Sequence, residues 1–318
     1  MYDDQVLQHY IHYITNLTKT HNVDNITRTD AYFTFYLQFP EIKWSFLASL
    51  VSRNAGYNMT DLYLPPFQLM LGEQERERLF MTYERANWLI FSDAYPQLLV
   101  YRLSLQLNQP LFHLLPYFHV SSFMVKEWNY FWKTADTNRI MIALIINEQN
   151  VIEQPVIRQS FFKKRVFHQA PYFLQNLLTM NAVLLPTKSA QLYGAFVHQF
   201  TSLTKRIELG KQLASILYSP STFKQIFAFA RQCEHTGSRY DYERFLNLPF
   251  PASPFLRMVY PVISHQDKIR KDWYKWGGIK KKWWNSEERN GCNWIGKEFY
   301  KKRSLIFAYY YVKRVFKG

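Results

Sequence analysis

The sequence predicts a mainly α protein with one large helical domain. Between the prolines, apolar residues recur every three or four positions, which is the spacing of one face of a helix. Alternating strand patterns are scarce, and 48 % of the 318 residues are hydrophobic, enough for a large packed core. We expect the helical domain over 1–248, a proline-rich strap over 249–264, and a basic, aromatic C-terminal segment over 265–318 packed beside the domain.

A helix is predicted over 41–54, where apolar residues cover a broad arc and small residues form a second arc. Small side chains let a neighbouring helix approach closely, so we expect this helix to be covered on two sides. Gly56 suits a left-handed C-terminal cap that would end the helix. The next helix, over 75–95, has one apolar face and stops before Pro96.

Further along the chain, the pattern of 187–219 predicts another helix, and Ser219 followed by Pro220 predicts the start of the next one. The segment 151–157 is the one fair strand pattern, and its proline would confine it to a sheet edge. Four prolines within 249–261 exclude a helix through that spacing, which is why we predict an extended strap.

Composition restricts the compartment. The only cysteines are Cys233 and Cys292, too few for a disulfide framework, and the N-terminus lacks the basic start and apolar run of a secretory signal. No apolar run approaches the roughly 20 residues that span a bilayer. We therefore expect a cytoplasmic protein without an integral membrane segment; a peripheral position at the inner face of the membrane stays open.

Several polar residues fall where the helical pattern requires apolar ones. Arg53 lies within the apolar arc of the first predicted helix, and Asn87 lies in the apolar face of the second, with Glu84 at its edge. A buried guanidinium needs a carboxylate or several carbonyls, because an unpaired buried charge is strongly destabilising. We predict that Arg53 pairs with Glu84 or Asp61. Three amides would complete this polar cluster: Asn54, Asn58 and Asn87.

Two interpretations of this cluster stay open. It can be a structural network that fixes how the two helices pack, or a pocket in which Arg53 binds an anionic ligand and the amides orient it. In the second case the protein is an enzyme or a small-ligand binder, with Asp61 or Glu84 as the candidate acid or base. A solvent-reaching cavity at Arg53 would favour the pocket, and a dry, fully paired Arg53 would remove it.

Familiar catalytic and metal-binding motifs are not found. The sequence has no GxSxG, Walker A, GxGxxG or HExxH motif. His113 and His119 lie six residues apart, but a core position is favoured over a metal site because no further ligand pattern accompanies them. Cys233 and His235 are neighbours in sequence, which does not make them a nucleophile and its base. We expect no metal and no cofactor, and the question of enzymatic activity stays open.

Three stretches are distinctive rather than generic. They are "NITRTDAYFTFYLQFPEIKWSFLASLVSRNAGYNMTDL" (25–62), "ERANWLIFSDAYPQLLVY" (84–101) and "LFHLLPYFHVSSFM" (111–124). Together they resemble a bacterial protein family of unknown function, the YppC-like family, over most of the chain. The resemblance implies a bacterial, non-secreted protein, and it brings no established activity, cofactor or catalytic residue.

The C-terminal segment carries most of the net charge. Residues 268–318 contain 15 Lys and Arg against 4 Asp and Glu, a net +11 out of +15 for the chain, and 265–318 contains five of the nine tryptophans. Interleaved basic and aromatic residues suit an anionic membrane surface, where Trp and Tyr favour the headgroup level. They also suit nucleic acid, where aromatic rings stack on bases, or a segment that docks on the helical body with its lysines at the rim.

The hypothesis favoured by the sequence is an interaction protein without enzymatic activity. It would contact an anionic surface, either a membrane or nucleic acid, through this segment, and the tryptophans tilt the choice toward a membrane. The electrostatic attraction would come from Lys280, Lys281, Lys282, Lys301, Lys302 and Arg303. Trp283 and Trp284 would supply apolar contact.

Overall fold

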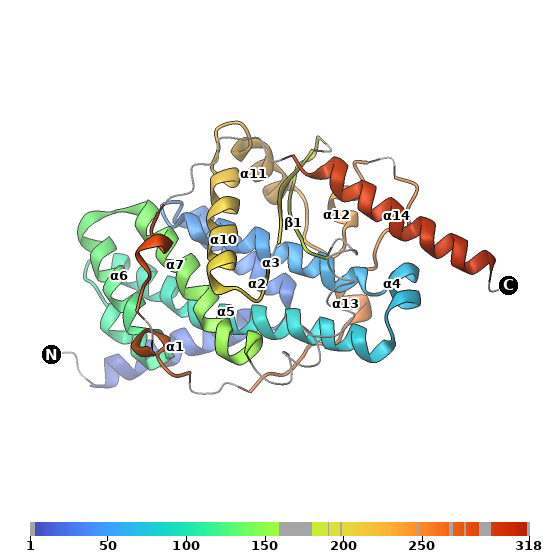
Figure 1. The fold of residues 1–318 in the computed structure, drawn as a ribbon. Coiled ribbons are helices and arrows are strands. Elements are labelled where there is room, and N and C mark those ends of the chain that lie inside the picture. The colour runs from blue at the N-terminus through green and yellow to red at the C-terminus, as the bar shows by residue number, and fades with distance from the viewer. Residues whose placement is uncertain are drawn as a thin grey trace.

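The structure is a computed structural model that describes residues 4–158, 180–189, 191–197, 199–246, 248–266, 270–276, 278–285 and 294–316. The described residues are mainly α-helical, which confirms the predicted fold class. Figure 1 shows the helices stacked lengthwise, with one small hairpin beside them and the last helix running to the C-terminus.

The longer helices are α1 (Asp4–His21), α2 (Asn25–Gln38), α3 (Lys43–Asp61), α5 (Glu73–Gln106), α6 (Ser122–Thr134), α7 (Thr137–Ile152), α10 (Leu203–Leu217), α11 (Phe223–Gln232) and α14 (Gly296–Val315). Shorter helical turns are α4 (Pro65–Met70), η1 (Phe112–Phe118), η2 (Glu153–Ile157), α12 (Tyr240–Glu243), α13 (Leu256–Val259), η4 (Trp273–Trp276) and η5 (Lys281–Trp283). The antiparallel strands β1 (Ala182–Pro186) and β2 (Leu192–Phe196) form a hairpin in which Leu184 lies opposite Gly194.

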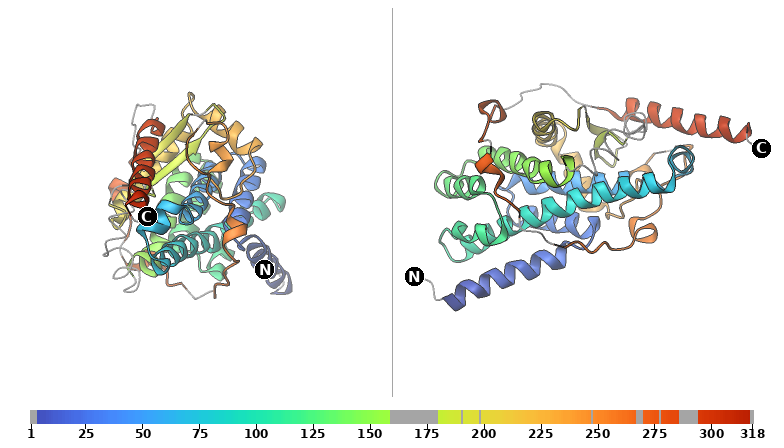
Figure 2. Two further views of the ribbon diagram at one scale, coloured as in Figure 1. Left: turned by 90° about the vertical axis from the view of Figure 1, so that its right-hand side faces the viewer. Right: turned by 60° about the horizontal axis from the view of Figure 1, so that its bottom comes forward.

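The central element is α3, which is buried from Trp44 to Asp61 except at the half-buried Val51. Helices α2, α5, α7 and α10 and strand β1 all pack against it, and Figure 2 shows them around it from two further directions. The helix does not end at Gly56, which corrects the predicted cap. A Cβ at Gly56 would clash with Asn25 Oδ1 and lie 3.2 Å from His235 Cε1, so the glycine serves close packing instead.

Pro96 does not end α5, which continues to Gln106. A proline in a helix lacks the N–H that would bond the carbonyl four residues earlier. Here that carbonyl, on Ser92, accepts a hydrogen bond from Arg270 Nη2 at 3.3 Å. The group orphaned by the proline is thereby satisfied from outside the helix, and the predicted end at Pro96 is wrong.

The predicted edge strand over 151–157 is also wrong. These residues complete α7 and form η2, a π-helical turn in which Arg158 N–H donates to the Glu153 carbonyl at 2.8 Å. Pro155 lies inside this turn and cannot donate the normal helical hydrogen bond, which accounts for the wider turn.

The helix predicted over 187–219 begins only at Leu203, because the hairpin occupies 182–196. Both strands are buried on both faces, so their sequence lacks the alternation that marks a half-exposed strand. The helix predicted to start at Ser219 starts at Phe223.

The predicted strap is extended but includes the short helical turn α13. Its Tyr260 stacks on Phe80 of α5 with ring centroids 3.7 Å apart. The following segment also packs on the body: α14 lies against α4 and buries Phe299 and Phe307. Within the described residues, no helix combines the length and apolar character needed to cross a bilayer.

Candidate functional site

Arg53 is buried on α3, with 4 % of the residue exposed. Its Nη2 donates to Asp241 Oδ2 at 3.1 Å and to the carbonyls of Cys233 and Glu234 at 2.8 and 2.5 Å. Its Nε donates to the Tyr57 hydroxyl at 2.8 Å. Burial and pairing of Arg53 were predicted, but the expected partners were wrong. In a helix Asp61 lies about 80° around the axis from Arg53, so the two side chains leave α3 in different directions.

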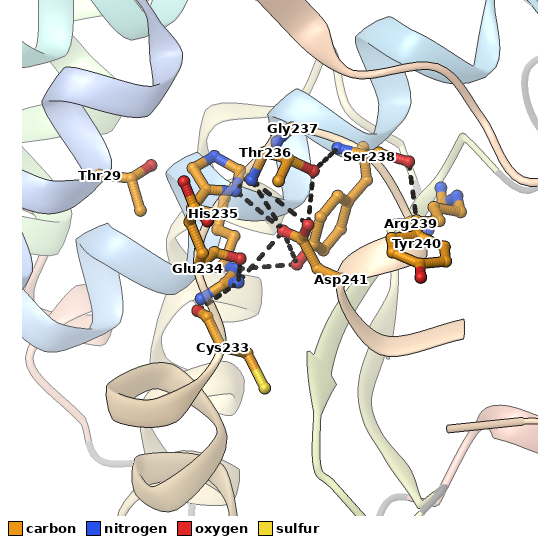
Figure 3. A network of polar contacts seen from close by, with 12 residues as sticks. Thr29, Cys233, Glu234, His235, Thr236, Gly237, Ser238, Arg239, Tyr240 and Asp241 are labelled. Atoms are coloured by element: carbon orange, nitrogen blue, oxygen red, sulfur yellow. Dashed lines mark hydrogen bonds and ion pairs between the residues drawn. The ribbon is translucent and has the colours of Figure 1, made fainter. Parts of the chain in front are cut away.

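The partner carboxylate, Asp241, belongs to the turn 233–241 drawn in Figure 3. Asp241 also accepts hydrogen bonds from the Thr236 hydroxyl at 2.6 Å and from the Thr236 N–H at 3.2 Å. Burial would raise the pKa of Asp241, but the hydrogen bond with His235 and the charge of Arg53 hold it below its ordinary value. This carboxylate is therefore ionised and fully engaged by the protein.

His235 lies in the same turn and contacts Asp241 at 3.3 Å and Asn25 Oδ1 at 2.8 Å. Burial lowers the pKa of His235 to about 4, although Asp241 opposes this. The imidazole is therefore neutral at neutral pH, and its contact with Asp241 is not an ion pair. Figure 3 shows the Cys233 sulfur pointing away from both side chains, into the apolar cluster that contains Phe229. Cys233 and His235 do not form a nucleophile and base.

A cleft of about 240 Å³ borders Arg53 and is also lined by Asp30, Glu234 and Arg231. Two carboxylates on this wall disfavour an anionic ligand, and the guanidinium is already neutralised by Asp241. These contacts favour the structural interpretation of Arg53.

Asp61 lies at the end of α3 between two guanidinium groups. Its Oδ2 is 2.6 Å from Arg239 Nε and 3.1 Å from Arg303 Nη1, and all three side chains are buried. Glu243 lies 3.6 Å from Arg303 and supplies a second carboxylate. Arg303 was predicted to bind an anionic partner; this is wrong, because the guanidinium is enclosed in this ion-pair cluster and cannot reach a partner.

Glu84 belongs to another cluster. It accepts two hydrogen bonds from Arg28 at 2.9 and 2.5 Å, and its Oε1 lies 3.3 Å from His265 Nε2. Burial would raise the pKa of Glu84, but the bonds from His265 and Arg28 outweigh it, so the pKa lies below its ordinary value. Glu84 is thus a paired structural carboxylate, and it lies apart from Arg53 and Asp61.

The three amides have different partners. Asn54 binds the edge of β1, donating to the Ala182 carbonyl and accepting from the Leu184 N–H, both at 3.0 Å. Asn58 donates to the Met180 carbonyl at 3.1 Å and accepts from Arg239 Nη2 at 2.9 Å. Asn87 donates to the Tyr83 carbonyl of its own helix at 2.8 Å. The six residues predicted as one cluster therefore do not form one: Asn58 and Asp61 share Arg239 as a partner, whereas Arg53, Asn54 and Glu84 each bind different residues. The polar side chains of α3 fasten the hairpin, the segment 233–241 and α14 to it.

A central cavity of about 200 Å³ lies between α3, α5, α7, α10 and the hairpin, and all three amides line it. It also exposes Glu148 of α7, which the sequence analysis missed. Glu148 accepts hydrogen bonds from Trp44 Nε1 at 3.1 Å and Gln149 Nε2 at 3.0 Å. Burial raises the pKa of Glu148 to about 7. The sequence did contain an indication of this residue: Glu148 lies one helical turn from Leu144 and from Ile152, in an apolar stretch.

The predicted anionic-partner residues do not form one surface. Trp283 is 4 % exposed and donates to the Thr204 hydroxyl at 3.2 Å, so its predicted contact with a partner is wrong. Trp284 is half-buried beneath the guanidinium of Arg139, 4.4 Å from its ring centroid. These rings dock on the helical body, the third possibility left open by the sequence.

The lysines of this segment fall into two groups. Lys280, Lys281 and Lys282 are exposed at η5, beside α10. Lys301 is exposed on α14, and the half-buried Lys302 pairs with Glu298 at 2.8 Å. Figure 1 and Figure 2 show η5 beside α7 and α10, whereas α14 runs to the opposite end of the molecule.

The family model described as "Protein of unknown function (DUF2515)" matches residues 20–291. The chain belongs to the DUF2515 family. A relative, the "Uncharacterized protein YppC" of Bacillus subtilis (strain 168), is 47 % identical over 287 residues, which cover 90 % of this chain and 89 % of the relative. This confirms the family resemblance inferred from the sequence. No solved structure matches the chain. Within this DUF2515 protein, the central cavity lies inside the matched residues, and α14 follows them.

Proposed function

We propose that the protein contacts an anionic membrane surface through the outer face of α14. One observation carries the proposal: an exposed apolar stripe repeats at helical spacing on the face turned away from the body. The stripe consists of Leu305, Tyr309, Val312 and Phe316, which are 64, 47, 56 and 85 % exposed. The buried face, with Phe299 and Phe307, lies on the opposite side of the helix. The C-terminal end of α14 projects past α4 (Figure 1).

Basic residues border this stripe. On a helical wheel Lys301 lies on one flank and Lys313 on the other. The only acidic residue of α14 is Glu298. An apolar stripe between lysines is the pattern of a helix that lies in the interface of a membrane. Each lysine near an anionic surface contributes about 1 kcal/mol.

The stripe favours lipid over nucleic acid. Leu305 and Val312 are aliphatic and offer no ring on which a base can stack. Their side chains contribute to binding only if they leave water, which an acyl-chain boundary permits.

The test uses the full chain, because a deletion of the segment would remove Arg303 and leave Asp61 with one guanidinium fewer. Co-sedimentation is measured with vesicles of phosphatidylcholine alone and of phosphatidylcholine mixed with phosphatidylglycerol. We expect binding to the anionic vesicles that weakens with salt. The double substitution Leu305→Ser and Phe316→Ser should abolish it. Leu37→Ser with Leu105→Ser removes two exposed apolar side chains outside α14, 50 and 41 % exposed, and should bind like the wild type.

A second pair of variants tests the charge. Lys301→Gln with Lys313→Gln should weaken binding about 30-fold, the equivalent of about 2 kcal/mol. Lys19→Gln with Lys133→Gln removes two exposed lysines outside α14 and should leave binding unchanged. Vesicle binding that survives the two serines contradicts the proposal. Binding of single-stranded DNA without vesicle binding would point to nucleic acid instead. If the wild type is a dimer and the double serine variant is a monomer, the stripe contacts a second copy of the chain.

A further inference from the structure

The central cavity is large enough for a small organic molecule. Its volume is about 200 Å³, and an apolar protein cavity of about 150 Å³ already holds benzene. Most of its wall is apolar and comes from α3, α5, α7, α10 and the hairpin, with Leu47, Ile90, Ile152, Leu213 and Val183 among the lining side chains. A ligand in this cavity would therefore have a mainly apolar body.

One carboxyl group interrupts the apolar wall. Glu148 is half-buried, and its two hydrogen-bond donors, Trp44 and Gln149, are neutral. No described Lys, Arg or His lies within ion-pair distance of it. Arg206 lines the same cavity, but its Nη2 is 2.5 Å from Glu153 and its Nε donates to Gln149 at 2.9 Å. When Glu148 is ionised, its charge therefore has no cation opposite it among the described residues.

The remaining polar groups of the cavity are largely engaged by the protein. The side-chain amides of Asn54, Asn58 and Asn87 donate to the carbonyls of Ala182, Met180 and Tyr83, and the oxygens of Asn54 and Asn58 accept hydrogen bonds from Leu184 and Arg239. Glu148 offers an ionised acceptor to a ligand that donates hydrogen bonds. An anionic ligand would lie beside the ionised Glu148, and this like charge disfavours it.

We infer that this cavity binds a small organic cation, with an apolar body in the apolar part and a protonated amine against Glu148. The inference is independent of the contact proposed for α14, because the two sites share no residue. An ammonium group would give the carboxylate the charge partner that no described residue supplies.

The state of Glu148 makes this binding pH-dependent. Burial raises the pKa of Glu148 to about 7, so the carboxyl group loses its charge in slightly acidic solution. The other titratable groups around it are Tyr32 of α2, Tyr83 of α5 and Arg206 of α10. Tyrosine and arginine change charge far above neutral pH. The charge of the cavity wall therefore changes near neutral pH through Glu148. The affinity for an alkylammonium ion should fall about tenfold between about pH 8 and about pH 6, as the ionised fraction falls.

The experiment is titration calorimetry of the full chain with octylammonium, octanol and octanoate. These probes share one alkyl chain and differ in the charge of the head. We expect octylammonium to bind most tightly at about pH 8 and about tenfold more weakly at about pH 6, octanol to bind weakly without pH dependence, and octanoate to bind least.

Glu148→Gln keeps the shape and removes the charge. We expect it to lose at least about tenfold affinity for octylammonium, together with the pH dependence. Glu77→Gln removes an exposed carboxylate of α5 and should bind like the wild type. Ala86→Phe fills the cavity and should abolish binding of all three probes; if it does not fold, Glu148→Gln decides alone. The inference is overturned if the wild type does not bind octylammonium, if octanol binds as tightly, or if Glu148→Gln binds octylammonium unchanged.

Discussion

Glu84 and Glu148 are both glutamates on long helices inside the helical body, and they differ in the groups that surround them. Glu84 receives two N–H groups from Arg28 and lies against His265. Among the described residues, Glu148 receives hydrogen bonds only from the neutral side chains of Trp44 and Gln149, and it borders the cavity. The pKa of Glu84 is accordingly lowered, and that of Glu148 is raised to about 7.

The comparison separates two uses of a buried carboxylate. A carboxylate held by a guanidinium is part of the fold, because removal of either partner leaves the other charge buried and unpaired. A carboxylate held by neutral donors at a cavity keeps an uncompensated charge, which a ligand can neutralise.

The largest effect is expected for Glu84→Gln. It leaves the guanidinium of Arg28 buried without a carboxylate, and we expect a loss of about 4 kcal/mol in the free energy of unfolding. Urea denaturation at neutral pH measures it, with Glu77→Gln as the exposed control, for which we expect a change below about 0.5 kcal/mol. Because the pKa of Glu84 is lower in the folded state, its contribution is present above its unfolded pKa and disappears as the pH falls through the folded value. A loss below about 1 kcal/mol would contradict a structural role for Glu84.

A somewhat smaller effect is expected for Arg53→Leu. The substitution leaves Asp241 buried without the guanidinium, although Asp241 keeps its hydrogen bonds from Thr236. We therefore expect a loss of about 3 kcal/mol in the free energy of unfolding. The control is Arg158→Leu, whose largely exposed guanidinium pairs with Glu153 and should contribute at most about 1 kcal/mol. Equal stability of Arg53→Leu and the wild type would show that Arg53 has no structural role.

The third prediction concerns Glu148, whose contribution to the free energy of unfolding should change with pH in the direction opposite to that of Glu84. The folded pKa of Glu148 is about 7 and its ordinary value is 4.5, so the folded state binds the proton more tightly. Its contribution to stability is fully present below about pH 4.5 and is lost as the pH rises toward about 7, a loss of about 2 kcal/mol after allowance for partial exposure. Urea denaturation across this window should show Glu148→Gln gaining on the wild type as the pH rises. Parallel stability curves would mean that Glu148 is not desolvated.

The smallest effect on stability is expected at the outer face of α14. Leu305→Ser with Phe316→Ser removes exposed side chains and should change the free energy of unfolding by less than about 0.5 kcal/mol per site. Thermal and urea denaturation measure it alongside the vesicle assay. A large loss would show that the stripe packs against this chain and is not free to contact a membrane.

Much of the fold could be predicted from local patterns. The mainly α class and the burial of Arg53 follow from helical periodicity. The continuation of α3 through Gly56 and of α5 through Pro96 could not be predicted, because contacts from Asn25, His235 and Arg270 override the local preference for a helix end.

The candidate site was harder to predict. Asp241 lies 188 residues from Arg53 in the sequence, and Arg303 lies 242 residues from Asp61. Helical periodicity indicates that a charged side chain is buried. It does not indicate which distant residue carries the opposite charge that neutralises it. Glu148 was visible as a carboxylate in an apolar stretch, yet only the three-dimensional arrangement shows that it borders a cavity.

The ion-pair cluster at the end of α3 has a consequence for the synthesis of this protein. Asp61 is translated before its partners Arg239 and Arg303, which lie 178 and 242 residues further along the chain. The helix at the centre of the fold therefore emerges long before its carboxylate can be neutralised. Until Arg303 has left the ribosome, the ion-pair cluster at the end of α3 cannot be completed.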